Sequence, residues 1–356
     1  MKKLSVCVLF GGISPEHEVS LRSAEFVLNC LDKEKYNVFP VGITKDGDWI
    51  LYTGEDYSLL PTGEWKNYPG NRRAAISPVR GQGLLSFEGD CVVREWIDVV
   101  FPVLHGENGE DGAMQGLLQM AGIPYVGPHV AASAVAMDKT LTKLVADQAG
   151  IPQAAWQLVR NSELDSRMDE ILKQLESRFC YPVFVKPAGT GSSVGVSKAA
   201  DREDLRSALL KAGTYDEKIL VEEFIHGREV EVAVMGNMSP VASECGEIDS
   251  GAEFYDYDAK YITDTSVAYI PARISDSVAE QVRDAAVKVY TAIGCQGLSR
   301  VDFFVTYADE RVVFNEINTL PGFTSISMYP KLFAASGIPS QQLIDELLKL
   351  AMEANE

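Results

Sequence analysis

Apolar residues in the first 122 positions form short runs that are separated by turns and amphipathic stretches. The run at residues 4–10 ends in Gly11-Gly12, which predicts a buried strand followed by a tight turn. A helix is expected next, with Ser14 as its N-cap and Pro15 at its first position. Further strands are predicted at residues 36–43, 49–52 and 97–104. This alternation favours an α/β domain built on a parallel sheet.

The rest of the chain alternates in the same way up to about residue 213, after which strands predominate. In a helix predicted at residues 138–149, the apolar stripe of Leu141, Leu144, Val145 and Ala149 is expected to be buried. Further helices are predicted at 162–177 and 276–293, and strands at 182–186 and 194–198. We expect three domains, at residues 1–122, 123–213 and 214–356.

Two strands near the C-terminal end place acidic residues on one face. They are predicted at residues 298–305 and 312–318, and the link 306–310 is short enough to close a hairpin. If the turn centres on Asp309, then Asp302 faces Glu316 and Arg300 faces Asn318, with Phe314 on the same face as Glu316. Facing carboxylates repel by about 0.2–1 kcal/mol. A bound Mg²⁺ removes this conflict, since carboxylate and amide oxygens are its preferred ligands; exposure to solvent or pairing with lysines is the alternative.

A glycine-rich segment at residues 186–198 is a candidate phosphate loop. Gly189 and Gly191 with Ser192 and Ser193 offer N–H groups and hydroxyls that can surround a phosphate, although the segment is not a Walker A motif. An ordinary turn is the alternative. Lys186 at the start of the loop and Lys139 at a helix start strengthen the nucleotide interpretation.

Three other segments are ambiguous by themselves. Glu222 and Glu223 follow an apolar strand, and two acids in this position are usually surface residues. Residues 253–261 contain four aromatic side chains and form either a lid or ordinary packing. The turn-rich acidic stretch at 105–112 follows a strand end, where ligands bind in α/β sheets, but a histidine such as His105 is also common as a structural residue.

Charge and composition exclude some classes of partner. The formal net charge of −19 makes a nucleic acid or an anionic membrane an unlikely ligand. The first apolar run, residues 4–10, leads into Gly11-Gly12 without the small-residue cleavage pattern of a signal peptide. No apolar run approaches the roughly 18 residues that a membrane span needs. The six cysteines are scattered without a CxxC pair, which is typical of reduced structural thiols. We therefore expect a cytoplasmic protein.

Several long motifs together resemble the ATP-grasp ligases, and within them the D-alanine–D-alanine ligase family, over essentially the whole chain. The motifs are residues 11–20, 105–112, 137–139, 186–198, 254–261 and 315–330. The resemblance implies an α/β (α+β) ATP-grasp fold, with a Rossmann-like N-terminal substrate-binding domain and with central and C-terminal domains that sandwich ATP. It implies ligation of two D-alanines through an acyl phosphate, for peptidoglycan precursor synthesis, by a homodimer.

The resemblance also implies ligands for the nucleotide and the metal. The residues expected around ATP are Lys139, Lys186, Ser192, Ser193, Glu222, Glu223, Phe224, Ile225, Glu229, Lys260, Phe304, Asn315 and Glu316. Two Mg²⁺ ions (or Mn²⁺) would be held by Asp302, Glu316 and Asn318.

For the amino acids, the resemblance implies contacts from Glu16, Val19, His105, Arg300, Gly322, Ser327 and Met328. Glu16, Ser192, Tyr261, Arg300 and Gly322 would take part in catalysis. D-alanine–D-serine and D-alanine–D-lactate ligases are the nearest alternatives, but Tyr261 and Met328 are similar to the D-alanine type. A nonenzymatic ATP-binding regulator is a remote alternative, because none of the metal ligands is missing.

Overall fold

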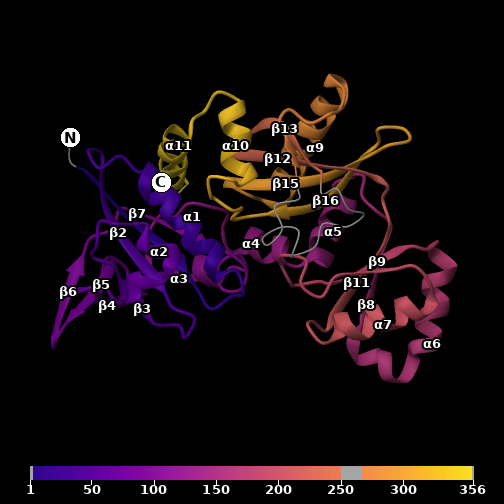
Figure 1. Cartoon of the computed structure of the whole chain (residues 1–356), viewed down its shortest axis with the longest axis horizontal. Helices are drawn as coiled ribbons and strands as arrows, with labels where there is room; N and C mark the ends of the chain where they lie inside the picture. The colour runs from indigo at the N-terminus through magenta and orange to yellow at the C-terminus, as the bar shows by residue number, and fades with distance from the viewer. Residues whose placement is uncertain (1–2, 250–266, 355–356) are drawn as a thin grey trace.

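The computed structural model describes residues 3–249 and 267–354, which form three β-sheets (Figure 1). A seven-stranded sheet has the order β6-β5-β4-β3-β2-β1-β7, a four-stranded sheet the order β10-β9-β11-β8, and a five-stranded sheet the order β14-β13-β12-β15-β16. The combination of helices with mixed and antiparallel sheets is the expected α/β architecture.

The seven-stranded sheet is parallel only in part. Strand β1 (Leu4–Gly11) lies between β2 (Tyr36–Ile43) and β7 (Val99–Leu104), and these three are parallel. The other four strands are antiparallel: β3 (Trp49–Leu51), β4 (Arg72–Ile76), β5 (Leu84–Glu88) and β6 (Cys91–Glu95). The prediction of a parallel sheet is therefore wrong beyond β2, because the link at residues 44–48 is too short for the crossover that a parallel pair needs.

Helix α1 (His17–Cys30) packs on this sheet and begins two residues later than expected. The hydroxyl of Ser14 accepts a hydrogen bond from the Glu16 N–H (3.1 Å) and donates one to the His105 carbonyl (2.7 Å). Ser14 thus fixes the turn before the helix and is not its N-cap. The other helical segments of this region are α2 (Leu59–Thr62), the 3₁₀ helix η1 (Glu64–Asn67) and α3 (Ala113–Ala121).

The four-stranded sheet is antiparallel and has α6 (Asn161–Arg178) and α7 (Arg202–Gly213) packed against it. Its strands are β8 (Trp156–Arg160), β9 (Val183–Pro187), β10 (Ser197–Ala199) and β11 (Lys218–Glu223). Strand β11 follows residue 213 and still pairs with β8 and β9, so this sheet continues past the expected domain boundary. The division into three domains stays a prediction.

In the five-stranded sheet, one face is covered by α9 (Asp276–Ile293) through Val278, Val282 and Val289. Its strands are β12 (Gly227–Gly236), β13 (Val241–Asp249), β14 (Val267–Tyr269), β15 (Gly297–Thr306) and β16 (Val312–Asn318). The connecting helices α4 (Val130–Met137) and α5 (Lys139–Gln148) pack near α9. Within the described ranges, no helix is both long enough and apolar enough to span a membrane.

The last two helices, α10 (Met328–Ala335) and α11 (Ser340–Glu353), return to the beginning of the chain (Figure 1). A single apolar cluster contains Leu21 of α1, Phe101 of β7, Leu298 of β15 and Leu347 of α11. The seven-stranded and five-stranded sheets therefore share one core.

The apolar stripe expected on α5 is wrong for Leu141 and Leu144, whereas Val145 and Ala149 are half-buried and Ala149 packs against the core. Leu141 and Leu144 are exposed (40% and 54%), whereas Thr140, Lys143 and Ala146 face the interior. A physical reason is at hand, since Lys143 on the inward face forms an ion pair with the buried carboxylate of Glu222, and a buried charge needs such a partner.

Candidate active site

A cavity of about 860 Å³ opens between the four-stranded and five-stranded sheets. Most of the residues expected around the nucleotide line it: Lys139, Lys186, Ser192, Ser193, Glu222, Glu223, Phe224, Ile225, Glu229, Phe304, Asn315 and Glu316. Arg300, Asp302 and Asn318 line the same cavity. Lys260 and Tyr261 lie outside the described residues.

The hairpin β15–β16 brings the acidic residues together in the expected register. Arg300 pairs with Asn318 and Asp302 with Glu316, which confirms the predicted pairing. Beyond this point the register shifts by one, so that Phe303 pairs with Phe314 and Asn315 is the extra residue of a β-bulge. The expectation that Phe314 shares a face with Glu316 is wrong, because the bulge turns Phe314 into the core under α9.

Arg300 is held between two carboxylates in this site. Its Nε and Nη2 each donate to Asp302 at 2.7 Å, and Nε also lies 3.2 Å from Glu231 Oε2. Burial would lower the pKa of Arg300, but Asp302 and then Glu231 raise it well above its usual value. Glu231 lies opposite Asp302, on the neighbouring strand β12. It was not predicted, because the pairing of β12 with β15 joins segments far apart in sequence and cannot be read from either segment alone.

The chemistry of the donor set suits a magnesium ion. Among the residues that the structure describes, no group of three or more His, Cys, Asp or Glu side chains could hold a metal by itself. Asp302 and Glu316 are cross-strand neighbours, and Asn318 donates to Asp302 at 3.0 Å. Mg²⁺ is typically bound through one or two carboxylates together with substrate phosphates and water, which this set fits.

A buried ion-pair cluster forms the opposite wall. Glu222 lies 2.5 Å from Lys143 Nζ and 2.7 Å from Lys186 Nζ. Burial alone would raise the pKa of Glu222, but the two lysines lower it to about 2. Lys186 also approaches Asn315 Oδ1 at 3.5 Å. Lys143 was missed by sequence analysis, because the apolar stripe wrongly placed it on the exposed face of its helix.

Beside this cluster, a mainly apolar pocket continues the cavity. Ile225 packs with Ala154, Val313 and Phe304. The ring centroids of Phe224 and Phe184 are 5.9 Å apart, and Lys198 Nζ lies 4.7 Å from the centroid of the Phe224 ring, above its face. Glu223 accepts a hydrogen bond from the Ala155 N–H at 2.9 Å. Flat apolar walls with a few polar groups are typical of a site for a planar heterocycle.

The glycine-rich loop reaches across to the N-terminal region. Ser192 and Ser193 have φ angles of 50° and 58°, which non-glycine residues rarely adopt. The Ser192 hydroxyl donates to Glu16 at the start of α1. A Cβ added at Gly191 would lie 3.2 Å from the same carboxylate. The loop is thus closed onto Glu16, and its residues 190–193 line the large cavity, where N–H groups and hydroxyls are the donors that suit an anion.

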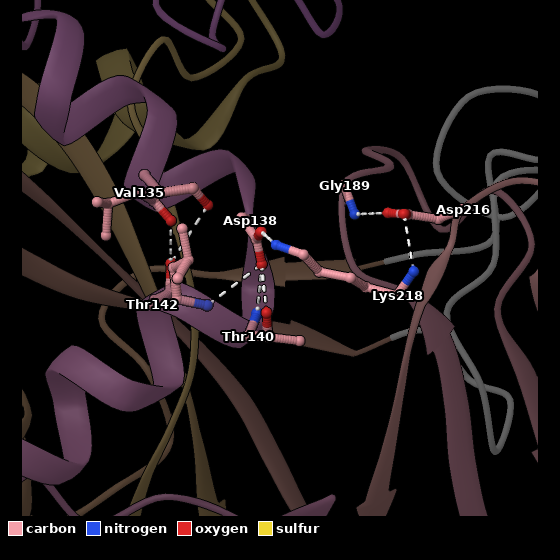
Figure 2. A network of polar contacts seen from close by, with 9 residues as sticks. Val135, Asp138, Thr140, Thr142, Gly189, Asp216 and Lys218 are labelled. Carbon is pink, nitrogen blue, oxygen red and sulfur yellow. Dashed lines mark hydrogen bonds and ion pairs between the residues drawn. The ribbon is translucent and has the colours of Figure 1, made fainter. Parts of the chain in front are cut away.

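The base of this loop is tied to α5 and β11 by a polar network (Figure 2). The Gly189 N–H donates to Asp216 Oδ2 at 2.7 Å, and Lys218 forms an ion pair with Asp138, the N-cap of α5. Lys139 Nζ donates to the Thr190 carbonyl at 2.5 Å.

His105 lies beside the loop that carries Gly322 and not in the large cavity. Both of its ring nitrogens are engaged: Nδ1 lies 3.0 Å from the Leu320 carbonyl, and Nε2 lies 3.2 Å from the Ser23 hydroxyl. Burial lowers the pKa of His105, which favours the neutral ring. Since Ser23 in turn accepts the Phe323 N–H at 3.2 Å, His105 fixes the backbone on both sides of Gly322.

The remaining residues expected at the amino acids lie near that loop or on α1. Ser327 accepts a hydrogen bond from the Thr324 N–H at 3.0 Å, and a Cβ at Gly322 would lie 3.0 Å from its hydroxyl. Met328 is buried against Gly246 in the shared core. Val19 is half-buried on α1, and among the described residues it is not part of either wall of the large cavity.

Glu110 is a further acidic residue of the cavity that sequence analysis did not select. It accepts the N–H groups of Gly106 (2.8 Å) and Leu320 (3.1 Å), and so joins the loop after β7 to the loop after β16. Burial and the nearby charge of Glu16 raise its pKa to about 8. It belongs to the turn-rich acidic stretch 105–112, whose place after a strand end was the signal for a site.

Comparison with known proteins identifies relatives over the whole chain. The model described as D-ala D-ala ligase N-terminus matches residues 5–128, and the D-ala D-ala ligase C-terminus matches residues 145–349. A D-alanine--D-alanine ligase of Caldicellulosiruptor bescii is 51% identical over all of this chain and 97% of its own length. One from Acetivibrio thermocellus is 49% identical over 99% of this chain and 96% of its own length.

Two solved structures are also similar. The VanG D-Ala:D-Ser ligase from Enterococcus faecalis has a TM-score of 0.89 and 37% identity, covering 98% of this chain and 100% of its own. The D-alanine-D-alanine ligase from Coxiella burnetii has a TM-score of 0.84 and 36% identity, covering 99% and 96%. The likeness in fold thus covers nearly the whole chain.

Proposed function

Because this chain belongs to the D-alanine–D-alanine ligase family, we propose that it uses ATP to join two D-alanines into D-alanyl-D-alanine. The observation that carries the proposal is the arrangement around the large cavity. Lys139 and Lys186 on one side face Asp302, Glu316 and Asn318 on the other, and the loop with Ser192 closes over them onto Glu16. This arrangement supports phosphoryl transfer, where charge must be neutralised around a phosphate group.

In the first step, a carboxylate oxygen of the first D-alanine attacks the γ-phosphorus of ATP. The bond to the β–γ bridging oxygen breaks, and ADP and an acyl phosphate form. Lys186, Lys139 and Lys260 contact the phosphates, and the Ser192–Ser193 backbone surrounds them. Asp302, Glu316 and Asn318 would hold two Mg²⁺ (or Mn²⁺) ions, which neutralise charge on the transferred group. Glu222, Glu223, Phe224, Ile225 and Phe304 enclose the adenine, and Glu229 binds the ribose.

In the second step, the neutral amine of the second D-alanine attacks the acyl carbon and forms the C–N bond. The C–O bond to phosphate breaks, phosphate leaves, and the amine proton is relayed by Tyr261 or Ser192. Arg300 and the Gly322 N–H stabilise the oxyanion of the tetrahedral intermediate, a contact worth roughly 3–4 kcal/mol when it is preorganised. Arg300 suits this role because two carboxylates already fix its half-buried guanidinium at the cavity wall. Water must be excluded, since it would hydrolyse the acyl phosphate.

Glu16 binds the ammonium group of the first D-alanine and forms a hydrogen-bonded triad with Ser192 and Tyr261. Val19 and His105 complete this subsite, and the His105 bonds to Leu320 and Ser23 support a positioning role. Ser327 and Met328 receive the second D-alanine. We also propose that the protein is a cytoplasmic homodimer; sedimentation of the purified chain at a monomer mass would contradict the dimer.

The test is phosphate release from ATP and Mg²⁺ by the purified chain, with and without D-alanine, D-serine and D-lactate. We expect release that depends on D-alanine, with D-alanyl-D-alanine identified by mass. A product that preferentially contains D-serine or D-lactate would reassign the second substrate. Nucleotide binding without any D-alanine-dependent release would instead favour a regulator.

A further inference from the structure

We propose that Asp216 and Lys218 are positioning residues for the nucleotide site, which set the base of the glycine-rich loop against the start of α5. The inference rests on the proposed use of ATP at this site. Among the described residues, neither side chain is part of the cavity wall. Both must therefore act through the groups that they hold, which are Gly189 and Asp138 (Figure 2).

Asp138 has two separate tasks, one for each oxygen. Its Oδ1 accepts the Thr140 N–H (3.0 Å) and the Leu141 N–H (3.2 Å), which caps α5. Its Oδ2 forms the ion pair with Lys218, 80 residues later at the start of β11. Burial would raise the pKa of Asp138, but the bond from Lys218 lowers it, which keeps the carboxylate ionised. The ion pair thus connects the N-terminus of α5 to the four-stranded sheet.

Asp216 connects the same strand to the loop. One oxygen accepts the Lys218 N–H at 3.0 Å, and the other accepts the Gly189 N–H at 2.7 Å (Figure 2). A Cβ added at Gly189 would lie 3.1 Å from this second oxygen, so the loop backbone passes directly over the carboxylate. Asp216 therefore fixes the residue at which the glycine-rich loop leaves the sheet.

The two connections meet at Lys139. Its backbone N–H donates to the Ala188 carbonyl (3.0 Å), while Ala188 itself donates to the Lys218 carbonyl (2.9 Å). The Lys139 ammonium then contacts the carbonyl of Thr190, two residues further along the loop. A shift of Lys218 or Asp216 would consequently move Lys139 and the loop relative to each other. Misplacement by about 1 Å is enough to weaken a preorganised phosphate site.

The test uses Lys218→Met, which removes the charge but keeps most of the side-chain length. Asp138→Ser keeps a capping oxygen but lacks the carboxylate. We expect each to raise the KM for ATP and the Kd of a nonhydrolysable ATP analogue about five- to tenfold, with less than a twofold change in the KM for D-alanine. Lys218→Arg should restore most of the affinity, and the double variant should lose little more than either single variant. Lys349→Met, at an exposed ion pair on α11, is the matched control.

Hydrogen exchange provides a second readout, because Asp216→Ala should expose the Gly189 amide and speed its exchange while distant amides are unchanged. The proposal is overturned if Lys218→Met and Asp138→Ser leave analogue binding within twofold of the unaltered chain. It is equally overturned if nucleotide and D-alanine constants rise together with a fall in the unfolding free energy, as a merely structural role predicts. If the unaltered chain binds the ATP analogue but does not ligate D-alanine, the proposed function fails and the positioning role can still be tested by analogue binding. If the unaltered chain does not bind the analogue, both the proposed function and the positioning role are overturned.

Discussion

At the scale of single residues, the charge count around Glu222 decides how the cavity meets a polyphosphate. Two lysines and one carboxylate leave one net positive charge in a buried place. With Lys186 alone, the carboxylate would neutralise the lysine that faces the nucleotide. Lys143 satisfies Glu222 from behind, which leaves the charge of Lys186 available to a phosphate. Glu316 and Glu229 also act on Lys186 and, together with Glu222, raise its pKa although burial would lower it, so the ammonium stays charged in this acidic cavity.

Glu222→Gln tests this cluster through stability. The buried Lys143 and the half-buried Lys186 would then face a neutral amide, and we expect the unfolding free energy to fall by roughly 3–5 kcal/mol. Urea unfolding of both proteins measures the difference. Glu223→Gln, at the neighbouring and less buried position, can keep its bond to Ala155 and should lose less than about 1 kcal/mol. An equal loss in the two variants would contradict the ion-pair account.

Glu110 gives a prediction for pH dependence. Its pKa is raised to about 8 in the folded chain, whereas an unfolded glutamate titrates near its usual value, about 4.3. Between these values the folded state binds more protons, so this group makes the protein less stable as the pH rises from about 4.5 to 8. Glu110→Gln, which resembles the protonated acid, should remove that part of the slope. A variant whose unfolding free energy has the same pH dependence as the unaltered chain would refute this assignment.

At the scale of elements, the hairpin β15–β16 shows how a local irregularity builds a site. The bulge lets Asn315 and Glu316, which are adjacent in sequence, both line the cavity. Phe314 and Ile317 also reach the cavity wall, but they are buried in the core under α9. A regular strand would alternate, and one of the two polar side chains would point into apolar packing. The bulge therefore adds the polar side chain of Asn315 to the cavity wall, and the apolar side chains of the strand stay buried.

Deletion of Asn315 should straighten the strand and keep the apolar pairs, but remove the amide beside Lys186. We expect the KM for ATP to rise about tenfold, equivalent to roughly 1.4 kcal/mol, with a smaller rise for Asn315→Ala, which keeps the bulge. Steady-state kinetics at saturating D-alanine measure both. If the deletion leaves the KM for ATP unchanged, the bulge has no part in nucleotide binding.

The elements also show where prediction from sequence succeeds and fails. The pairing of Asp302 with Glu316 was predictable, because a short link and the period-two alternation of strands together fix the register of a hairpin. The bulge at Asn315 was not, since an extra residue has no signature in an otherwise regular pattern. Lys143 and Glu231 were missed for a related reason, because each forms an ion pair with a residue far away in sequence. The partner of Lys143 is Glu222, and that of Glu231 is Arg300. Local periodicity carries no information on such partners, and for α5 it selected the wrong face.

At the scale of the whole molecule, the C-terminal end of the chain packs against its N-terminal region. Helices α10 and α11 come from the C-terminal end, yet they share a core with α1 and the seven-stranded sheet. Polar contacts reinforce this, because Asp345 of α11 accepts bonds from Lys35 (2.6 Å) and Tyr36 (2.8 Å). The region that carries Glu16 is thereby held in a fixed relation to the strands that carry Arg300 and Asp302. Two substrates and ATP can react only if these parts are aligned.

Leu347→Ala tests this coupling. Leu347 is fully buried in the shared core, so we expect a loss of roughly 2–5 kcal/mol in unfolding free energy. Trp49, Trp65 and Trp96, three of the four tryptophans, lie in the N-terminal region and report its unfolding by fluorescence. Since one core joins both ends of the chain, the fluorescence transition should move to lower urea together with the loss of helical circular dichroism. Lys349→Met on the exposed side of α11 should move neither. If the tryptophan transition stayed in place while the circular dichroism shifted, the N-terminal region would fold independently of α11, and the alignment of Glu16 with Arg300 would need another explanation.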